Sequence, residues 1–142
     1  WLHFQIADKP IAKARVYATA RGIYDLYING SRINSSYFSP GSTQYNKTHR
    51  YQIYDITELL YKGPNAIGVQ LAEGWWSGGA TFMGENWNVF GDRQSIYAAC
   101  GSIDPRFGYW LVGNLKCVSQ HRHTTFGQLP ECHAAVLAPE TV

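Results

Sequence analysis

The residues best suited to contact a ligand are concentrated between Gly74 and Arg93, a stretch that carries five glycines and three tryptophans. Tryptophan rings offer flat apolar faces that stack on the C–H faces of sugars, while amide, carboxylate and guanidinium groups bond to hydroxyls. Glycines let the backbone approach a partner closely. We therefore predict a contact site for carbohydrate or for another domain, with the candidate residues Trp76, Trp87, Asn86, Asp92 and Arg93.

Two of the tryptophans, Trp75 and Trp76, are adjacent. If this stretch is extended, the two side chains point to opposite faces, so that one ring can enter the core while the other faces outward. The alternative is that the outward ring packs against the rest of a larger protein, because aromatic surfaces mark protein interfaces as well as ligand sites.

The ten acidic residues are the candidates for hydrolytic chemistry. Cleavage of a glycosidic bond uses two carboxyl groups roughly 5 to 10 Å apart, one of them with a raised pKa. Glu85 and Asp92 both lie within the tryptophan-rich stretch and could meet, whereas Asp55 and Glu58 are better explained as helix caps. We predict that the chain contains no catalytic residues.

Five residues near the C-terminal end have the side-chain types of zinc ligands: Cys117, His121, His123, Cys132 and His133. Their Cys-x3-His-x-His spacing fits no standard structural zinc pattern, so we predict neither a metal nor a cofactor. The three cysteines allow at most one disulfide and do not identify the compartment, so the localisation stays open.

Two sequences are acceptor motifs for N-linked glycans, one from Asn34 to Ser36 and one from Asn46 to Thr48. They have a consequence only in a eukaryotic secretory route.

The periodicity is that of β-strands. Apolar and polar residues alternate in short stretches, which predicts strands at residues 2–6, 14–18, 23–28, 31–33, 49–54, 67–71, 94–100 and 109–112. Asn29 and Gly30 predict a tight hairpin because both residues tolerate positive φ. Asp55 and Glu58 fit a capping box for one short helical turn that ends before Gly63.

Many short strands and a single helical turn predict an all-β fold, an antiparallel β-sandwich or jelly roll. The alternating apolar positions predict a core in which eight side chains point inward: Phe4, Val16, Leu26, Ile28, Ile53, Ile67, Val69 and Leu71.

Length and composition limit the classes of protein. The chain has 142 residues, 45% of them hydrophobic and 15% charged, which is enough apolar material for one packed core and excludes disorder of the whole chain. The net charge is +2 without a basic stripe, so we predict no nucleic-acid partner, and the absence of a long apolar run predicts no membrane contact. Because the chain opens at Trp1 without an initiator methionine, we interpret it as an excerpt.

Five motifs together resemble the N-terminal domain of bacterial α-L-rhamnosidases of glycoside hydrolase family 78. They are Tyr24–Gly30 (YDLYING), Tyr51–Leu60 (YQIYDITELL), Gly63–Val69 (GPNAIGV), Gly74–Gly78 (GWWSG) and Gly91–Arg93 (GDR). The similarity extends over about residues 4 to 99. The hairpin and the capped turn also occur in the sugar-binding domain of family 2 glycosidases, which shares the galactose-binding-like jelly roll.

The chain departs from the family pattern at two places. The family loop commonly reads Pro-Gly-Trp-Thr-Asp-Tyr, whereas Pro40–Tyr45 reads PGSTQY and lacks both the aromatic residue and the acid. Some related modules bind rhamnose with help from calcium, which prefers carboxylate ligands, so Gln44 weakens that site. Residues 101–142 do not match the family. We therefore expect a β-sandwich core at residues 1–100 and a divergent segment at residues 101–142 that completes or flanks the same domain.

The resemblance implies a non-catalytic accessory domain of an α-L-rhamnosidase, an enzyme that hydrolyses terminal α-L-rhamnosides. In that family the catalytic acids belong to a later helical barrel, so the expected partners are the rest of the parent glycosidase and L-rhamnose-containing carbohydrate. The alternatives are a free-standing carbohydrate-binding module, the family 2 sugar-binding domain, or an interaction domain without a ligand.

Overall fold

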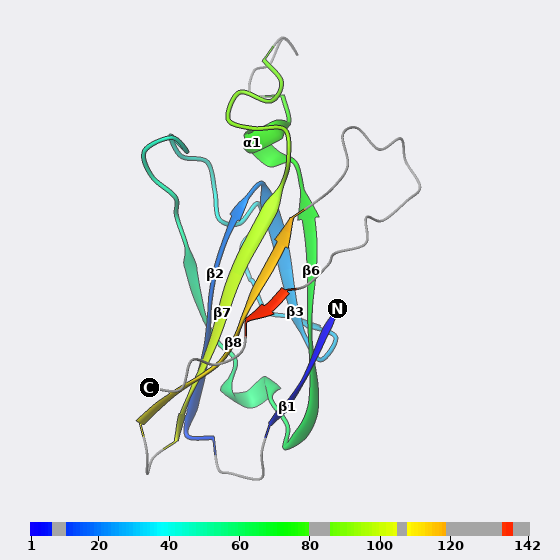
Figure 1. The fold of residues 1–142 in the computed structure, drawn as a ribbon, viewed down its shortest axis with the longest axis vertical. Helices are drawn as coiled ribbons and strands as arrows, with labels where there is room; N and C mark the ends of the chain where they lie inside the picture. Colours follow the sequence, from blue (N-terminus) through cyan, green and yellow to red (C-terminus); the bar gives the residue numbers. More distant parts are fainter. Residues whose placement is uncertain (7–10, 80–85, 105–107, 119–134, 138–142) are drawn as a thin grey trace.

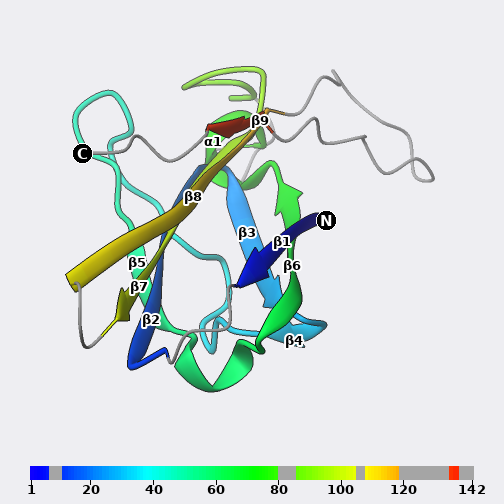
Figure 2. The same ribbon diagram turned by 60° about the horizontal axis from the view of Figure 1, so that its bottom comes forward.

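The computed structural model describes residues 1–6, 11–79, 86–104, 108–118 and 135–137, and beyond residue 101 it describes the backbone only. The strands form two antiparallel sheets (Figures 1 and 2). The four-stranded sheet has the order β1 (Leu2–Ile6), β6 (Gly63–Ala72), β3 (Ile23–Ile28) and β4 (Ser31–Arg32). The five-stranded sheet has the order β5 (Gln52–Asp55), β2 (Lys13–Arg21), β7 (Ser95–Asp104), β8 (Gly108–Val118) and β9 (Ala135–Leu137). The predicted antiparallel β-sandwich is therefore confirmed.

The core lies between the two sheets and follows from the alternation along β2 and β3. Ala14, Val16, Ala18 and Ala20 point inward from β2, and Tyr24, Leu26 and Ile28 point inward from β3. The small alanines of one sheet leave room for the larger side chains of the other. Burying a leucine or isoleucine side chain contributes roughly 1.5 to 3 kcal/mol, so these positions stabilise the sandwich directly.

Seven of the eight predicted core residues contribute to this cluster. Val16, Leu26, Ile28 and Ile67 are buried, and Phe4, Val69 and Leu71 are partly buried and pack against them.

The prediction for Ile53 was wrong, because its side chain is 49% exposed. Gln52 and Tyr54 are the inward residues of β5, since the Tyr24 hydroxyl donates to Gln52 Oε1 at 3.0 Å and lies 3.0 Å from the Tyr54 hydroxyl. Ile56, just beyond the strand, takes the buried apolar position instead.

The hairpin between β3 and β4 is confirmed. Asn29 has φ 49° and Gly30 has φ 86°, and Ile28 pairs with Ser31 across the turn.

The helical turn is the 3₁₀ helix η1 (Thr57–Leu59), which is shorter than predicted. Asp55 Oδ1 accepts from the Thr57 amide at 3.1 Å and from the Thr57 hydroxyl at 2.6 Å. Within the described residues no hydrogen bond returns from Glu58, so only the Asp55 half of the predicted capping box is present.

The four-residue helix α1 (Gly74–Ser77) at the end of β6 was not predicted, so the condition of extended backbone at Trp75 and Trp76 is not met. None of the helices in the described ranges has the length and hydrophobicity of a membrane span.

The expected boundary at residue 100 falls inside β7, which continues to Asp104. β8 then pairs with β7 along its length, with a register shift between Cys100 and Gly101. The backbone after residue 100 thus adds strands to the five-stranded sheet.

Candidate functional site

The predicted contact site begins at α1, where Trp76 is buried rather than presented to solvent. Its ring is 8% exposed and lies edge-on to Tyr45, with ring centroids 5.4 Å apart. It is stacked with Phe90 at 6.2 Å and tilted against His49 at 6.0 Å, and the Arg21 guanidinium stands 4.9 Å from the ring centroid. Trp76 is therefore a packing residue and offers no free face to a ligand.

Residues 86–94 are held against α1 by contacts with the Trp76 ring and its neighbours. A β-carbon on Gly91 would stand 2.7 Å from the Trp76 ring, so the glycine allows the backbone to lie on the indole. The Phe90 amide donates to the Trp76 carbonyl at 3.4 Å, and Gln94 Nε2 donates to Ser77 Oγ. These contacts position residues 86–94 at one end of the sandwich.

The other four predicted contact residues, Asn86, Trp87, Asp92 and Arg93, are exposed. Of the two predicted contact tryptophans, Trp76 is buried, whereas Trp87 is 50% exposed and presents ring surface to solvent. Glu85, the predicted partner of Asp92, lies outside the described residues, as do the side chains of Cys117, His121, His123, Cys132 and His133.

A hollow of about 220 Å³ lies on the outer face of the four-stranded sheet. Its walls include Ile23 and Asp25 of β3, Gln70 and Ala72 of β6, and Tyr37 and Phe38 of the loop after β4. The sequence analysis missed this hollow. The available signal was the adjacent pair of aromatic residues in an otherwise polar loop, facing outward-pointing polar positions of two strands.

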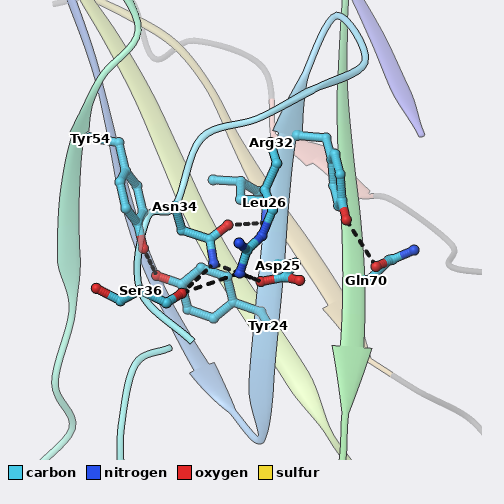
Figure 3. A network of polar contacts seen from close by, with 9 residues as sticks. Tyr24, Asp25, Leu26, Arg32, Asn34, Ser36, Tyr54 and Gln70 are labelled. Atoms are coloured by element: carbon cyan, nitrogen blue, oxygen red, sulfur yellow. Dashed lines mark hydrogen bonds and ion pairs between the residues drawn. The ribbon is translucent and has the colours of Figure 1, made fainter. Parts of the chain in front are cut away.

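A network of polar contacts fixes the Asp25 carboxylate beside the hollow (Figure 3). Asp25 Oδ1 accepts from Arg32 Nη2 at 2.8 Å and from Asn34 Nδ2 at 2.7 Å, while Asn34 Oδ1 accepts from the Leu26 amide at 3.0 Å. The hydrogen bond from Arg32 lowers the pKa of Asp25. The carboxylate is thus an oriented acceptor whose charge is balanced by a neighbouring cation.

Aromatic rings and one amide complete the surroundings of the hollow. The Arg32 guanidinium lies 5.1 Å from the Tyr37 ring centroid, and Phe38 lies edge-on to Trp75 of α1 at 6.1 Å. Gln70 Oε1 accepts from the Tyr27 hydroxyl at 3.1 Å (Figure 3). Rings beside fixed polar groups are suited to a neutral ligand that carries hydroxyls, because the rings supply apolar contact and the polar groups supply direction.

The aromatic surface continues along the same sheet. Trp1 lies over Gly68, where a β-carbon would stand 2.5 Å from its ring, and it contacts Tyr27 with centroids 6.3 Å apart. Tyr27 and Gly68 are cross-strand partners in β3 and β6. We call Trp1, Tyr27, Tyr37, Phe38 and Trp75 the aromatic face.

Hydrogen bonds change the proton affinity of two carboxyl groups in the described residues. The Arg32 contact lowers the pKa of Asp25, and hydrogen bonds from Thr57 lower the pKa of Asp55, whereas a general acid needs a raised pKa. Burial raises the pKa of the Cys100 thiol to about 12, so this cysteine is not a nucleophile at neutral pH. Across the described part of the chain, no three potential metal ligands come together.

Comparison with known proteins gives one consistent family. Residues 9–102 match the model of the α-L-rhamnosidase N-terminal domain. The chain is 36% identical over 95 residues to an α-L-rhamnosidase of Streptomyces avermitilis, which is 67% of this chain and 9% of that protein. It is 41% identical over 90 residues to an α-L-rhamnosidase of Formosa agariphila, or 63% of this chain and 9% of that protein.

Solved structures show the same similarity. The native α-L-rhamnosidase from Aspergillus terreus superimposes with a TM-score of 0.74 at 31% identity, over 83% of this chain and 14% of that one. The Streptomyces avermitilis α-L-rhamnosidase complexed with L-rhamnose superimposes with a TM-score of 0.73 at 31% identity, over 78% and 11%. This chain therefore spans about a tenth of the length of the enzymes it resembles.

Proposed function

Since the chain belongs to the α-L-rhamnosidase N-terminal domain family, we propose that it is a non-catalytic accessory domain of a larger α-L-rhamnosidase. The carrying observation is that relatives bearing that enzyme name are matched over only 9% of their length. The partner is then the rest of the parent glycosidase, including its helical catalytic barrel. The family match sets aside the family 2 sugar-binding domain, and the free-standing carbohydrate-binding module remains the alternative.

Two of the described carboxyl groups, those of Asp25 and Asp55, support a non-catalytic role. The Asp25 carboxylate accepts hydrogen bonds from Arg32 and Asn34, and the Asp55 carboxylate accepts hydrogen bonds from Thr57. These hydrogen bonds lower the pKa of both carboxyl groups, which opposes donation of a proton to a leaving group.

An assay of the isolated chain tests this role. Incubation with 4-nitrophenyl α-L-rhamnopyranoside should release nitrophenol at the buffer rate. Turnover that is lost in Asp92→Asn or Glu85→Gln would overturn the proposal, because it would place a catalytic carboxyl group within this domain.

The aromatic face is the surface that we assign to the parent enzyme. Exposed rings clustered on one side of a domain favour a protein interface, where aromatic residues are enriched. In the full-length enzyme, Tyr37→Ser/Phe38→Ser should lower the temperature at which activity is lost. Tyr97→Ser is the matched control, because Tyr97 is an exposed tyrosine of β7 on the other sheet. Equal effects of the two variants would argue against this assignment.

A carbohydrate contact is the second candidate function, and the combination of rings with fixed polar groups at the hollow favours it. The Phe38–Trp75 contact links the hollow to α1 and so to the exposed residues Asn86, Trp87, Asp92 and Arg93. A shallow site with one stacking ring would bind with millimolar affinity, about −4 kcal/mol.

An NMR titration with L-rhamnose to high millimolar concentration tests the contact. Shifts confined to residues 37–38 and 70, or to residues 86–93, would support it and would locate the sugar. Tyr37→Ala and Trp87→Ala should each remove the shifts at their own end, and Tyr97→Ala should remove neither. Absence of shifts at both ends would leave only the docking role.

A further inference from the structure

The two glycan acceptor motifs differ completely in their surroundings, and the proposed function assigns a glycan to neither of them. We infer that this chain, when it passes through a eukaryotic secretory route, carries one N-linked glycan at Asn46 and none at Asn34. The fungal enzyme among the structural relatives shows that the fold is also found in a eukaryote.

Asn34 cannot carry a glycan in the folded chain. Its side chain is 2% exposed, and its Nδ2 donates to Asp25 Oδ1 at 2.7 Å and to the Ser36 carbonyl at 3.1 Å. Its Oδ1 accepts from the Leu26 amide inside the sheet. A sugar attached to Nδ2 would remove one donor and would require space that the loop occupies. Molecules modified there would fail to close the β3–β4 region.

Asn46 has the opposite environment. It is exposed, and its side chain has no hydrogen-bond partner among the described residues. The turn that presents it is closed by Gln44, whose carbonyl accepts from the Lys47 amide at 2.8 Å and from the Thr48 amide at 2.9 Å. Lys47 is not proline, and Thr48 is exposed, so the motif meets the requirements of an acceptor at a surface turn.

The neighbouring residue anchors this turn to the body of the domain. Tyr45 is buried, packs edge-on against Trp76 and donates its hydroxyl to the Gly41 carbonyl at 3.3 Å. The loop before β5 projects to the side of the sandwich in both views (Figures 1 and 2). A glycan at Asn46 would therefore extend from a rigid turn into solvent without displacing core residues.

The transfer requires a lipid diphosphate-linked oligosaccharide, which the secretory route supplies. The Asn46 amide nitrogen gives up one proton to a base of the transferase and forms a bond to C1 of the oligosaccharide. The bond between C1 and the phosphate oxygen breaks, and the lipid diphosphate leaves with that electron pair. The product is bulky and polar, as suits a surface position.

The test is secretion of the 142-residue chain from yeast, with intact mass measured before and after peptide N-glycosidase. The enzyme converts a glycosylated asparagine to aspartate, so peptide mapping in ¹⁸O-water identifies the site. We expect the label at Asn46 and none at Asn34. Asn46→Gln and Thr48→Ala should both lose the glycan mass completely, whereas Ser36→Ala, which destroys the other motif, should keep it.

Two results would overturn the inference: secreted wild-type chain without a glycan, or a glycan that persists in Asn46→Gln. The same variants made in bacteria should show unchanged thermal unfolding, which separates loss of the acceptor from loss of the fold. Because the readout is a mass, it is independent of the proposed accessory role.

Discussion

The Trp76 indole lies directly on Gly91, with the ring 2.7 Å from the place of a β-carbon at residue 91. This contact joins α1 to the segment from residue 86 onward. The ring cannot move away easily, because Tyr45 and Phe90 pack against it. The contact explains why a tryptophan predicted to face a ligand is part of the interior.

Gly91→Ala should therefore destabilise the domain by about 1 to 3 kcal/mol, the range for overpacking of a well-filled site. The sign is informative, since Gly→Ala at an unconstrained position stabilises by about 0.4 to 1 kcal/mol through the unfolded state. Urea unfolding followed by tryptophan fluorescence measures the change. Ser35→Ala, at an exposed loop position, is the control and should stay within about 0.5 kcal/mol. A midpoint for Gly91→Ala at or above that of the wild type would contradict the packing.

Asn34 lies in the loop after β4 and uses both ends of its side-chain amide. Two substitutions separate the role of the Oδ1 acceptor from that of the Nδ2 donor. Asn34→Ala leaves the buried Leu26 amide without its acceptor, which should cost about 1 to 3 kcal/mol. Asn34→Asp keeps that acceptor but places a second carboxylate against Asp25, which the Asn34 amide contacts at 2.7 Å.

Two adjacent carboxylates raise the pKa of the pair in the folded state. The penalty in Asn34→Asp should therefore be largest at pH 7 and should shrink as the pH falls and one carboxyl group takes up a proton. The penalty in Asn34→Ala should not shrink in this way. Chemical denaturation at pH 7 and at about pH 4 measures both. Identical pH dependence in the two variants would contradict the assigned bonds.

The Asp25–Arg32 pair predicts part of the acid dependence of stability. The pKa of the Asp25 carboxyl group is lowered in the folded state, mainly by the hydrogen bond from Arg32, relative to about 3.9 in the unfolded chain. Asp25 therefore stabilises the fold at pH values above the unfolded pKa, and this contribution is lost as the pH falls through the folded value. The stability difference between wild type and Asp25→Asn should shrink over that range.

Arg32→Ala is the matched variant, because it removes the principal cause of the lowered pKa and should flatten the acid dependence in the same direction. Chemical denaturation at steps between about pH 2 and pH 6 gives the two curves. A difference between wild type and Asp25→Asn that stays constant across the range would contradict the coupling.

The burial of Ile56 and the exposure of Ile53 give a further prediction. Ile56 is 1% exposed and belongs to the core, whereas Ile53 is 49% exposed on the outer face. Ile56→Ala should cost about 2 to 5 kcal/mol, the usual range for a buried isoleucine. Ile53→Ala should change the unfolding free energy far less, and thermal or urea unfolding of both variants decides between them. The reverse order would restore the inward assignment of Ile53.

The sequence predicted those elements whose signals are local. Tyr24, Leu26 and Ile28 fall at alternate positions of β3, and Asn29-Gly30 follows at once, so the strand, its inward face and its turn were all predicted correctly. The sequence also predicted the family correctly, because the motifs from Tyr24 to Arg93 are specific in combination.

Tertiary structure decided the positions where two local patterns compete. In β5 the local pattern allows either Ile53 or Tyr54 to face inward. Tyr54 and Gln52 face inward because both contact the hydroxyl of Tyr24, a buried residue of the opposite sheet. The placement of Trp76 follows the same rule, since only the arrival of Gly91 and Phe90 from later in the chain makes burial of its ring favourable.

The tertiary structure also decided the place of the hollow and the difference between the two acceptor asparagines. Asp25, Tyr37 and Gln70 come from three separate segments, and their proximity follows from the pairing of β3 with β6. Asn34 and Asn46 stand in equivalent motifs, yet one is enclosed by Asp25 and Leu26 and the other is exposed on a turn. Alternation and turn preference act over a few residues and so determined the strands, whereas burial depends on which distant segment packs against a side chain, and only the folded sandwich specifies that.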